Sequence, residues 1–431
     1  MILGTFSRVF AGLPLLALAS AAANEKLINM PANTWMEVAG TQMESVCFKP
    51  APKDQPCTYV TKAWNGGVYD QVDRKMLVWG GGHGDYYGNE VYAFNTETLK
   101  WERLTNPSSG VVEGMDPLPD GQPVSRHTYD GLSYVAHKGR MLAYGGATAG
   151  AGNGTSVTWA FDAATKAWEN RKAAGGRPGG SECCEFSSDY DPVTKKVYLK
   201  EPNYIWSYDF ELNAWKQLLE WPMNGDPRKS KVDPTRGILF TIGSGDFQAY
   251  DIKQNKNVTS SWATTGGGPA LASYGPGMDY DWNADKLVAW VGGGPWALDM
   301  KTRQWTQMSG TGAPAKGEDA GTYGRWRYLE QDNVFILVNT VTQNVYFYKH
   351  TAGPGVLRNT VEVKDPRRGD VRPGAHPEAF LSGRDGAGMR DARGARIVND
   401  KGAPAASGAY IVVPGPEGES RGRAAIRSLA K

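Results

Sequence analysis

Residues 69–81 read YDQVDRKMLVWGG, and this stretch indicates the fold. In it, a polar turn leads into an apolar strand that ends in two glycines. Residues 134–146 repeat the pattern as YVAHKGRMLAYGG. Weaker copies begin at Tyr190, Val232, Tyr280 and Tyr328. The starts of successive copies lie 65, 56, 42, 48 and 48 residues apart, which is typical of repeat architectures in which each copy forms one structural unit.

Two more predicted strands follow most copies. The first alternates aromatic and small residues, as in 91–94 and 158–161, and this period of two is typical of half-buried strands. The second begins with tryptophan, at Trp101, Trp168, Trp215, Trp262 and Trp305. The sixth copy lacks such a strand, but Thr34–Val38 carries one at the front of the chain. We therefore predict six four-stranded sheets in a ring closed by the N-terminal strand, which leaves no sheet edge free for aggregation.

The double glycine, the aromatic strand and the spaced tryptophan resemble the kelch repeat, whose period is about 50 residues. The resemblance covers residues 34–350 and implies an all-β fold, a β-propeller of four-stranded blades. We place this propeller at 24–352. A seventh blade would have to be an unmarked one, in 106–125 or 45–61.

The composition agrees with an all-β chain. Its 431 residues include 54 Gly and 26 Pro, which are poor in helix interiors and argue against a helix bundle. The 47 Lys and Arg nearly balance the 45 Asp and Glu, so global charge does not indicate a nucleic-acid-binding protein. The mean hydropathy of −0.47 argues against membrane insertion, and we expect a monomer.

The N-terminus and the cysteines bear on localisation. Arg8, an apolar stretch at 9–18 and small residues after it predict a secretory signal peptide at 1–23, with a membrane anchor as the alternative. Secretion to an extracellular or periplasmic compartment permits disulfides. Cys47 and Cys57 could close a loop, and the adjacent Cys183 and Cys184 could form a vicinal disulfide or stay free. Their pairing is left open.

The C-terminal segment 353–431 differs from the repeats. It has no tryptophan, and it holds 14 Lys and Arg against nine Asp and Glu. Such a composition buries too little apolar area to offset the entropy of ordering, so we predict a poorly structured tail. The residues 411–413 could form an isolated strand. A surface-binding or secretion appendage is the alternative.

The propeller interpretation brings distant loops to one face. The loops before the innermost strands share this face with the loops between strands two and three, and such loops carry function on a rigid scaffold. The candidates for catalysis are His83, His127, Tyr129 and Arg126. The candidates for substrate binding are Asn65, Asp85, Tyr86, Tyr87, Glu185, Arg228, Tyr274, Tyr323 and Arg325. Structural roles are the alternative, such as a pairing of Arg126 with Asp130 or Glu185.

The leading functional interpretation is that the protein binds or acts on an anionic polysaccharide, by β-elimination of a uronate. This reaction needs a group that neutralises the carboxylate, a base for the C5 proton and an acid for the leaving oxygen. The first role falls to Arg126, Arg228 or Asn65. The other two fall to His83, His127 or Tyr129. Some propeller polysaccharide lyases are loosely similar: His83 matches the second of their two histidines, whereas Asn65 stands at the place of the first.

Two alternatives remain open. Galactose oxidase is a kelch enzyme that holds copper with two histidines and two tyrosines, one of which is crosslinked to a cysteine. His83, His127 and nearby tyrosines are candidate ligands, but adjacent cysteines do not match a lone crosslinking cysteine. The other alternative is a non-catalytic propeller that binds a glycan or a protein. We expect no cofactor, and a metal ion at His83 and Asp85, or at His127, is left open.

Overall fold

The computed structural model describes residues 24–176, 178, 184, 186–222, 229–355, 410–413 and 425–428. The predicted signal peptide, Cys183, Glu185, Arg228 and most of the predicted tail lie outside the described residues. The chain divides into two compact units, Met1–Val371 and Arg372–Lys431. In the second unit, β25 (Tyr410–Val413) pairs antiparallel with β26 (Ala425–Ser428), so a strand is present at 411–413 but it is paired and not isolated. A second isolated strand expected at 361–363 lies outside the described residues.

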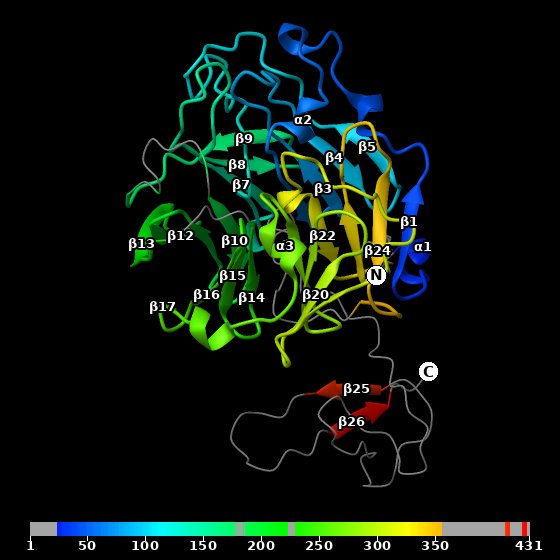
Figure 1. Cartoon of the computed structure of the whole chain (residues 1–431). Helices are drawn as coiled ribbons and strands as arrows, with labels where there is room; N and C mark the ends of the chain where they lie inside the picture. The colour runs from blue at the N-terminus through cyan, green and yellow to red at the C-terminus, as the bar shows by residue number, and fades with distance from the viewer. Residues whose placement is uncertain are drawn as a thin grey trace, which may run out of the picture. The chain divides into compact units, whose positions relative to one another are not determined.

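The first unit is a β-propeller of six four-stranded antiparallel blades, as predicted (Figure 1). Blade 1 consists of β2 (Gly67–Asp70), β3 (Lys75–Val78), β4 (Tyr92–Asn95) and β5 (Lys100–Arg103). Blade 2 consists of β6 (Leu132–Val135), β7 (Arg140–Tyr144), β8 (Thr158–Asp162) and β9 (Ala167–Asn170). Blade 3 consists of β10 (Ser187–Asp191), β11 (Lys196–Lys200), β12 (Tyr204–Asp209) and β13 (Ala214–Glu220).

The remaining blades repeat this order. Blade 4 consists of β14 (Lys229–Asp233), β15 (Ile238–Gly243), β16 (Asp246–Asp251) and β17 (Lys256–Asn257). Blade 5 consists of β18 (Gly277–Asp281), β19 (Lys286–Trp290), β20 (Trp296–Asp299) and β21 (Trp305–Gln307). Blade 6 consists of β22 (Trp326–Leu329), β23 (Val334–Leu337), β24 (Val345–Lys349) and β1 (Thr34–Val38).

The N-terminal strand closes the ring as predicted. Strand β1 pairs antiparallel with β24, with Trp35 opposite Tyr348. The Trp35 ring lies 5.0 Å from the ring of Tyr348 and 5.7 Å from that of Trp326, measured between centroids. The segments 45–61 and 106–125, which the structure describes in full, contain no strand. The propeller therefore has six blades and not seven.

A repeated aspartate explains why the sequence turns where it does. The Asp70 carboxylate accepts hydrogen bonds from the backbone N–H groups of Val72 and Asp73, at 2.9 Å each. Side chains of this kind that bind the backbone two residues on stabilise tight turns. Asp191, Asp233 and Asp281 hold the same turns in later blades. In blades 1, 3, 4 and 5 the first two strands are thus joined by a turn that an aspartate side chain caps.

Blade 4 departs from the prediction. Trp262 does not open the fourth strand: that strand is the two-residue β17, and Trp262 lies in the 3-10 helix η4 (Thr259–Trp262). The Thr259 hydroxyl accepts a hydrogen bond from the N–H of Ala249 at 3.0 Å, so a side chain replaces the backbone ladder there. Trp262 still packs edge-on against Phe240, at 4.9 Å between ring centroids. The tryptophan pattern therefore correctly indicated a residue that packs against the blade, but wrongly predicted that this residue begins a strand.

Short helices and disulfide bonds complete the described part of the propeller. The helices are α1 (Glu25–Ile28), η1 (Met43–Val46), η2 (Pro52–Asp54), α2 (Tyr59–Lys62), η3 (Ala136–Lys138), α3 (Gly268–Ala272) and η5 (Tyr323–Arg325). Cys47 and Cys57 form the disulfide that the sequence left open. Cys184 is also disulfide-bonded. None of the helices in the described residues is long and apolar enough to span a membrane.

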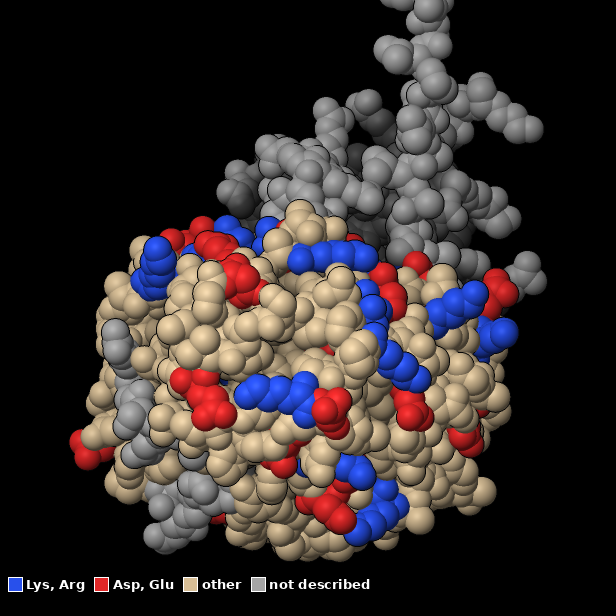
Figure 2. All heavy atoms as spheres, turned by 90° about the horizontal axis from the view of Figure 1, so that it is seen from above, with Lys and Arg blue, Asp and Glu red and all other residues tan. Residues whose placement is uncertain are grey.

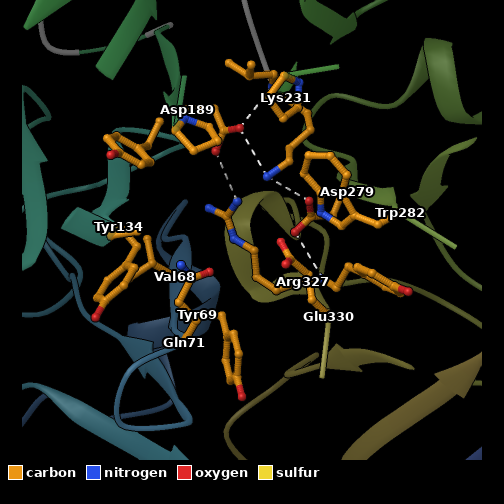
Figure 3. A pocket seen from close by; sticks show the side chains of 16 residues that line it. Val68, Tyr69, Gln71, Tyr134, Asp189, Lys231, Asp279, Trp282, Arg327 and Glu330 are labelled. Atoms are coloured by element: carbon orange, nitrogen blue, oxygen red, sulfur yellow. Dashed lines mark hydrogen bonds and ion pairs between the residues drawn. The ribbon is translucent and has the colours of Figure 1, made fainter. Parts of the chain in front are cut away.

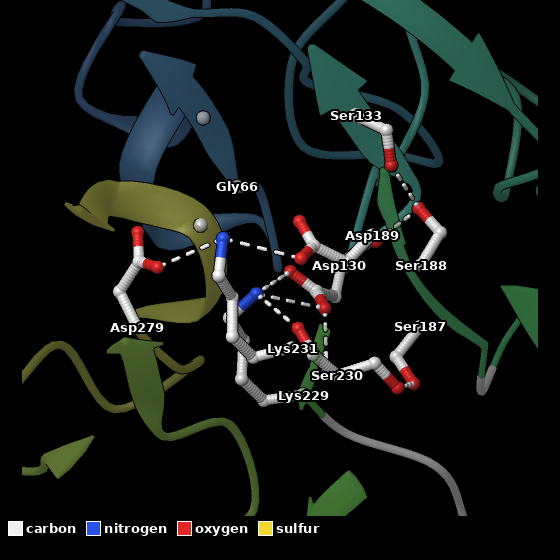
Figure 4. Close-up of polar contacts among 12 residues, drawn as sticks. Gly66, Asp130, Ser133, Ser187, Ser188, Asp189, Lys229, Ser230, Lys231 and Asp279 are labelled. Atoms are coloured by element: carbon white, nitrogen blue, oxygen red, sulfur yellow. Dashed lines mark hydrogen bonds and ion pairs between the residues drawn. The ribbon is translucent and has the colours of Figure 1, made fainter. Parts of the chain in front are cut away.

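Ion pairs between the inner strands line the axis of the propeller. The Lys231 ammonium lies between two carboxylates, 3.1 Å from Asp189 and 2.9 Å from Asp279 (Figure 3). Lys229 lies 2.8 Å from Asp130, and both side chains are fully buried (Figure 4). The inner strand of blade 4 thus carries two lysines whose charges are balanced by aspartates of blades 2, 3 and 5.

A cavity of about 100 Å³ opens on the axis at one end of the ring. Its lining includes the ion-pair residues Asp189, Lys231 and Asp279 of the inner strands, and residues that follow these strands, such as Gln71, Pro192 and Trp282. The predicted site residues precede the starts of these strands or lie in the loops between strands two and three. The axial cavity is therefore lined by none of them.

Candidate functional site

The loop at residues 82–88 of blade 1, called here the histidine loop because it carries His83, packs against the loop that leads into blade 2. The loop follows β3, and Gly82 within it has a φ of +91°. A Cβ atom on Gly82 would lie 2.3 Å from the backbone nitrogen of His127, so only glycine permits this approach. The rings of His83 and His127 lie 6.0 Å apart between centroids, edge to face. The structure thus brings together the two histidines that the sequence placed on one face.

His127 is paired with a carboxylate. Its Nε2 lies 2.8 Å from Oδ2 of Asp85, which the histidine loop supplies. The His127 side chain is almost fully buried, whereas the Asp85 side chain is 29% exposed. Burial lowers the pKa of His127 below its ordinary value of 6.5, and the hydrogen bond to Asp85 opposes this shift. At neutral pH the imidazole is therefore uncharged, and Asp85 fixes its orientation.

Three aromatic residues stand at the same position before the inner strands of blades 1, 2 and 6. Trp64, Tyr129 and Tyr323 have φ values of 52°, 45° and 49°, in the left-handed region. Tyr129 and Tyr323 contact each other edge to face, at 6.1 Å between ring centroids, and both are buried. Trp64 is half-buried and lies 5.1 Å from the His127 ring. Of the three, Trp64 is the aromatic side chain that reaches the surface beside the histidines.

The predicted site arginines have internal partners. Arg126 is fully buried and binds Asp116 at 2.7 Å, which replaces the suggested pairing with Asp130 or Glu185. Arg325 is fully buried too, and its guanidinium donates to backbone carbonyls, including those of Asn65 at 2.8 Å and Val338 at 2.7 Å. Burial lowers the pKa of Arg325 to about 10. Both side chains hold loops together and present no exposed cation to a substrate.

Other predicted binding residues are also drawn into the fold. The buried Asn65 amide oxygen accepts from the N–H of Thr128 at 2.9 Å. The buried Tyr86 hydroxyl donates to Glu90 at 2.8 Å. Tyr274, which precedes β18 in blade 5, is 40% exposed. Of the predicted residues in blades 1 and 2, His83 is exposed and Asp85 partly exposed, whereas the neighbouring His127 and Tyr87 are buried.

The sequence analysis missed three side chains next to the histidine loop: Lys53, Gln55 and Glu113. Tyr87 donates a hydrogen bond to Glu113 at 3.0 Å, and the ammonium of Lys53 lies 3.8 Å from the centre of its ring. Gln55 hydrogen-bonds to the backbone of Gly84 and of Tyr87. These residues lie in long connections without repeat signals. The glycines and prolines around them mark loops but do not place side chains.

The donor set bears on the copper interpretation. Among the described residues, no group of three or more His, Cys, Asp or Glu side chains is arranged to hold a metal ion. The Nε2 atom of His127 is already bound to Asp85. The hydroxyls of the nearby Tyr86 and Tyr87 are likewise bound, to Glu90 and Glu113, so these side chains are not gathered as the two-histidine, two-tyrosine copper site of galactose oxidase.

The charge pattern argues against a broad basic surface on the face drawn in Figure 2. Acidic and basic side chains alternate there, without a large field of either sign. Recognition of an anion on such a surface depends on individual side chains and not on a general potential.

Comparisons with known proteins give no relative: no family model matches this chain, and no curated protein matches it either.

Proposed function

We propose that this protein is a secreted, kelch-type β-propeller that binds an anionic polysaccharide on the face of His83 and His127. One observation carries the proposal: loops of blades 1 and 2 bring an exposed imidazole, a half-buried indole and polar side chains to one surface. Aromatic rings beside hydrogen-bonding groups suit sugars, because a sugar ring has an apolar face and a hydroxylated edge. The disulfide Cys47–Cys57 supports secretion, because disulfides persist in oxidising compartments.

Affinity electrophoresis on a panel of immobilised polyuronates tests this function. We expect the wild-type protein to be retarded on at least one polymer, and Trp64→Ala to weaken binding about tenfold, since a lost aromatic contact is worth about 1–1.5 kcal/mol. Trp262→Ala removes a similarly half-buried indole from blade 4 and serves as the matched control. Unfolding curves of both variants report whether the fold is retained. The proposal fails if no polyuronate retards the wild type, or if Trp64→Ala binds as tightly as Trp262→Ala.

A second candidate function is β-elimination with His127 as the base. The pairing with Asp85 favours it, because a neutral imidazole held by a carboxylate can accept a proton in a defined orientation. Since Arg126 and Arg325 are buried, the reaction would need another cation to neutralise the uronate carboxylate. An increase in ultraviolet absorbance from an unsaturated uronate product distinguishes elimination from binding alone.

Elimination makes a prediction about pH. Burial lowers the pKa of His127, so the acid limb of the kcat/KM profile should lie below pH 6.5. Asp85→Asn removes the contacts that raise this pKa, and we expect the limb to move to still lower pH. We also expect the rate to fall by about 10²–10⁴-fold, because the base loses its orienting group. An unchanged profile in Asp85→Asn would exclude His127 as the base.

A further inference from the structure

A disulfide-closed loop brings a lysine to the surface beside the histidine loop. The loop runs from Cys47 to Cys57. Within it, Lys53 and Asp54 have φ values of 48° and 57°, which are unfavourable for residues other than glycine. Such backbone conformations persist where the surrounding structure holds them, and they are frequent at ligand sites. The loop therefore presents Lys53 in a conformation that the chain alone does not favour.

A glutamine joins this loop to the histidine loop. The Gln55 side-chain amide donates to the carbonyl of Gly84 at 2.7 Å, and its oxygen accepts from the N–H of Tyr87 at 3.0 Å. These contacts lie on either side of Asp85, the partner of His127. The two loops are thus held in one arrangement around the imidazole pair.

The Lys53 ammonium is held loosely. It lies over the Tyr87 ring, 3.8 Å from the centroid, and 3.9 Å from the Glu113 carboxylate. The side chains of Lys53 and Glu113 are 51% and 58% exposed. Exposed pairs at such distances contribute little, so a carboxylate from a ligand can compete with Glu113. The short, buried pair of Arg126 and Asp116 offers no such opening.

Glu113, the partner of Lys53, and His83 flank the same glycine-rich turn. A Cβ atom on Gly150 would lie 2.3 Å from Cγ of Glu113, and one on Gly152 would lie 2.3 Å from Cδ2 of His83. The N–H of Gly150 also donates to the carbonyl of His83 at 2.7 Å. The Lys53–Glu113 pair and the imidazole of His83 are therefore neighbours across this turn.

We propose that Lys53 binds the carboxylate of an acidic sugar whose ring lies beside His83. This inference rests on the proposed polysaccharide-binding function and names the sugar class and the recognition group. Lys53 supplies the exposed cation that the sequence had assigned to arginines. Glu113 opposes it, so the two residues set affinity for the anion in opposite directions.

The test uses the full-length secreted chain and two polymers. One is the polyuronate that retards the wild type, and the other is the same polymer with its carboxyl groups reduced to alcohols. On the polyuronate, we expect Lys53→Gln to weaken binding about two- to fivefold and Glu113→Gln to strengthen it about twofold. On the reduced polymer neither variant should differ from the wild type. Lys256→Gln removes an exposed lysine from blade 4 and is the charge-matched control.

The outcomes separate this inference from the function on which it rests. If the wild type binds the polyuronate and Lys53→Gln binds it equally well, Lys53 is not the recognition group, while the binding function stands. If Glu113→Gln loses affinity, Glu113 itself contacts the sugar and the inference is overturned. If no polyuronate retards the wild type, the proposed function fails first. A salt titration adds a further readout, since the affinity of Lys53→Gln should fall less steeply with salt.

Discussion

Lys229→Met is expected to lower the free energy of unfolding by about 3–5 kcal/mol, because it leaves a buried carboxylate without its counter-charge. The Lys229 ammonium lies 2.8 and 3.1 Å from the two oxygens of Asp130, and both side chains have no exposed area. Asp130 also accepts from the N–H of Ser230 at 2.9 Å, so one hydrogen bond remains after the substitution. The midpoint and slope of urea unfolding measure the effect.

Two controls define what this result means. Lys316→Met breaks a pair with Asp319 in which both side chains are about three-quarters exposed, and it should cost less than about 1 kcal/mol. The double variant Asp130→Leu, Lys229→Met removes both charges and should recover much of the loss, since apolar replacements of buried pairs are often neutral. If Lys229→Met is as stable as the wild type, the axial ion pairs do not support the ring.

Arg325→Lys is expected to lower the free energy of unfolding by about 3 kcal/mol or more, although it preserves the charge. The lysine ammonium cannot replace all the N–H donors of the guanidinium, and each buried carbonyl left unpaired costs about 1–3 kcal/mol. The Arg325 guanidinium donates to the carbonyls of Asn65 and Thr61 and to those of Val338, Asn339 and Gly321. These groups belong to the start of blade 1 and to the loops of blade 6. The side chain therefore ties blade 1 to blade 6, the blade within which the ring closes.

This experiment also decides between the structural role and the binding role predicted from the sequence. A structural Arg325 predicts a lower melting temperature, with unchanged polyuronate binding in the fraction that remains folded. If Arg325 instead binds the polymer, polyuronate binding should weaken while the melting temperature stays unchanged. Arg140→Lys, whose side chain is 25% exposed and pairs with Asp162, is the matched control and should change neither property strongly. Thermal unfolding and affinity electrophoresis on the same preparations separate the two results.

The fold was predictable because its signals are local and repeated. Each blade carries its own apolar strands, and four of the six carry an aspartate-capped turn, so weak copies of one pattern support one another. The Trp35 strand was assigned to the last blade by counting alone, and its pairing with Tyr348 confirms the assignment. Trp262 is the exception. It packs against Phe240, but it does not lie in a strand, because the strand ends earlier and the Thr259 hydroxyl accepts a hydrogen bond from the N–H of Ala249.

The candidate site was predictable in part. The spacing placed His83 and His127 on one face, and their rings lie 6.0 Å apart. The spacing could not show that Asp85 binds His127, or that the disulfide-closed loop adds Lys53 to the same surface. Those contacts join loops whose lengths differ from blade to blade, so no repeat position specifies them.

The sequence by itself predicted the blades and their strand order, because these follow from periodic apolar residues and turn-forming aspartates close to one another in the chain. The closure by residues 34–38 was predicted by counting the tryptophan strands, and the structure shows the pairing and excludes a seventh blade. Only the tertiary structure decided which polar side chains the propeller uses for itself. Arg325 binds the carbonyl of Asn65, 260 residues away, and Arg126 binds a loop aspartate. Burial removes these charges from water, and their energy then depends on partners that only the folded chain supplies.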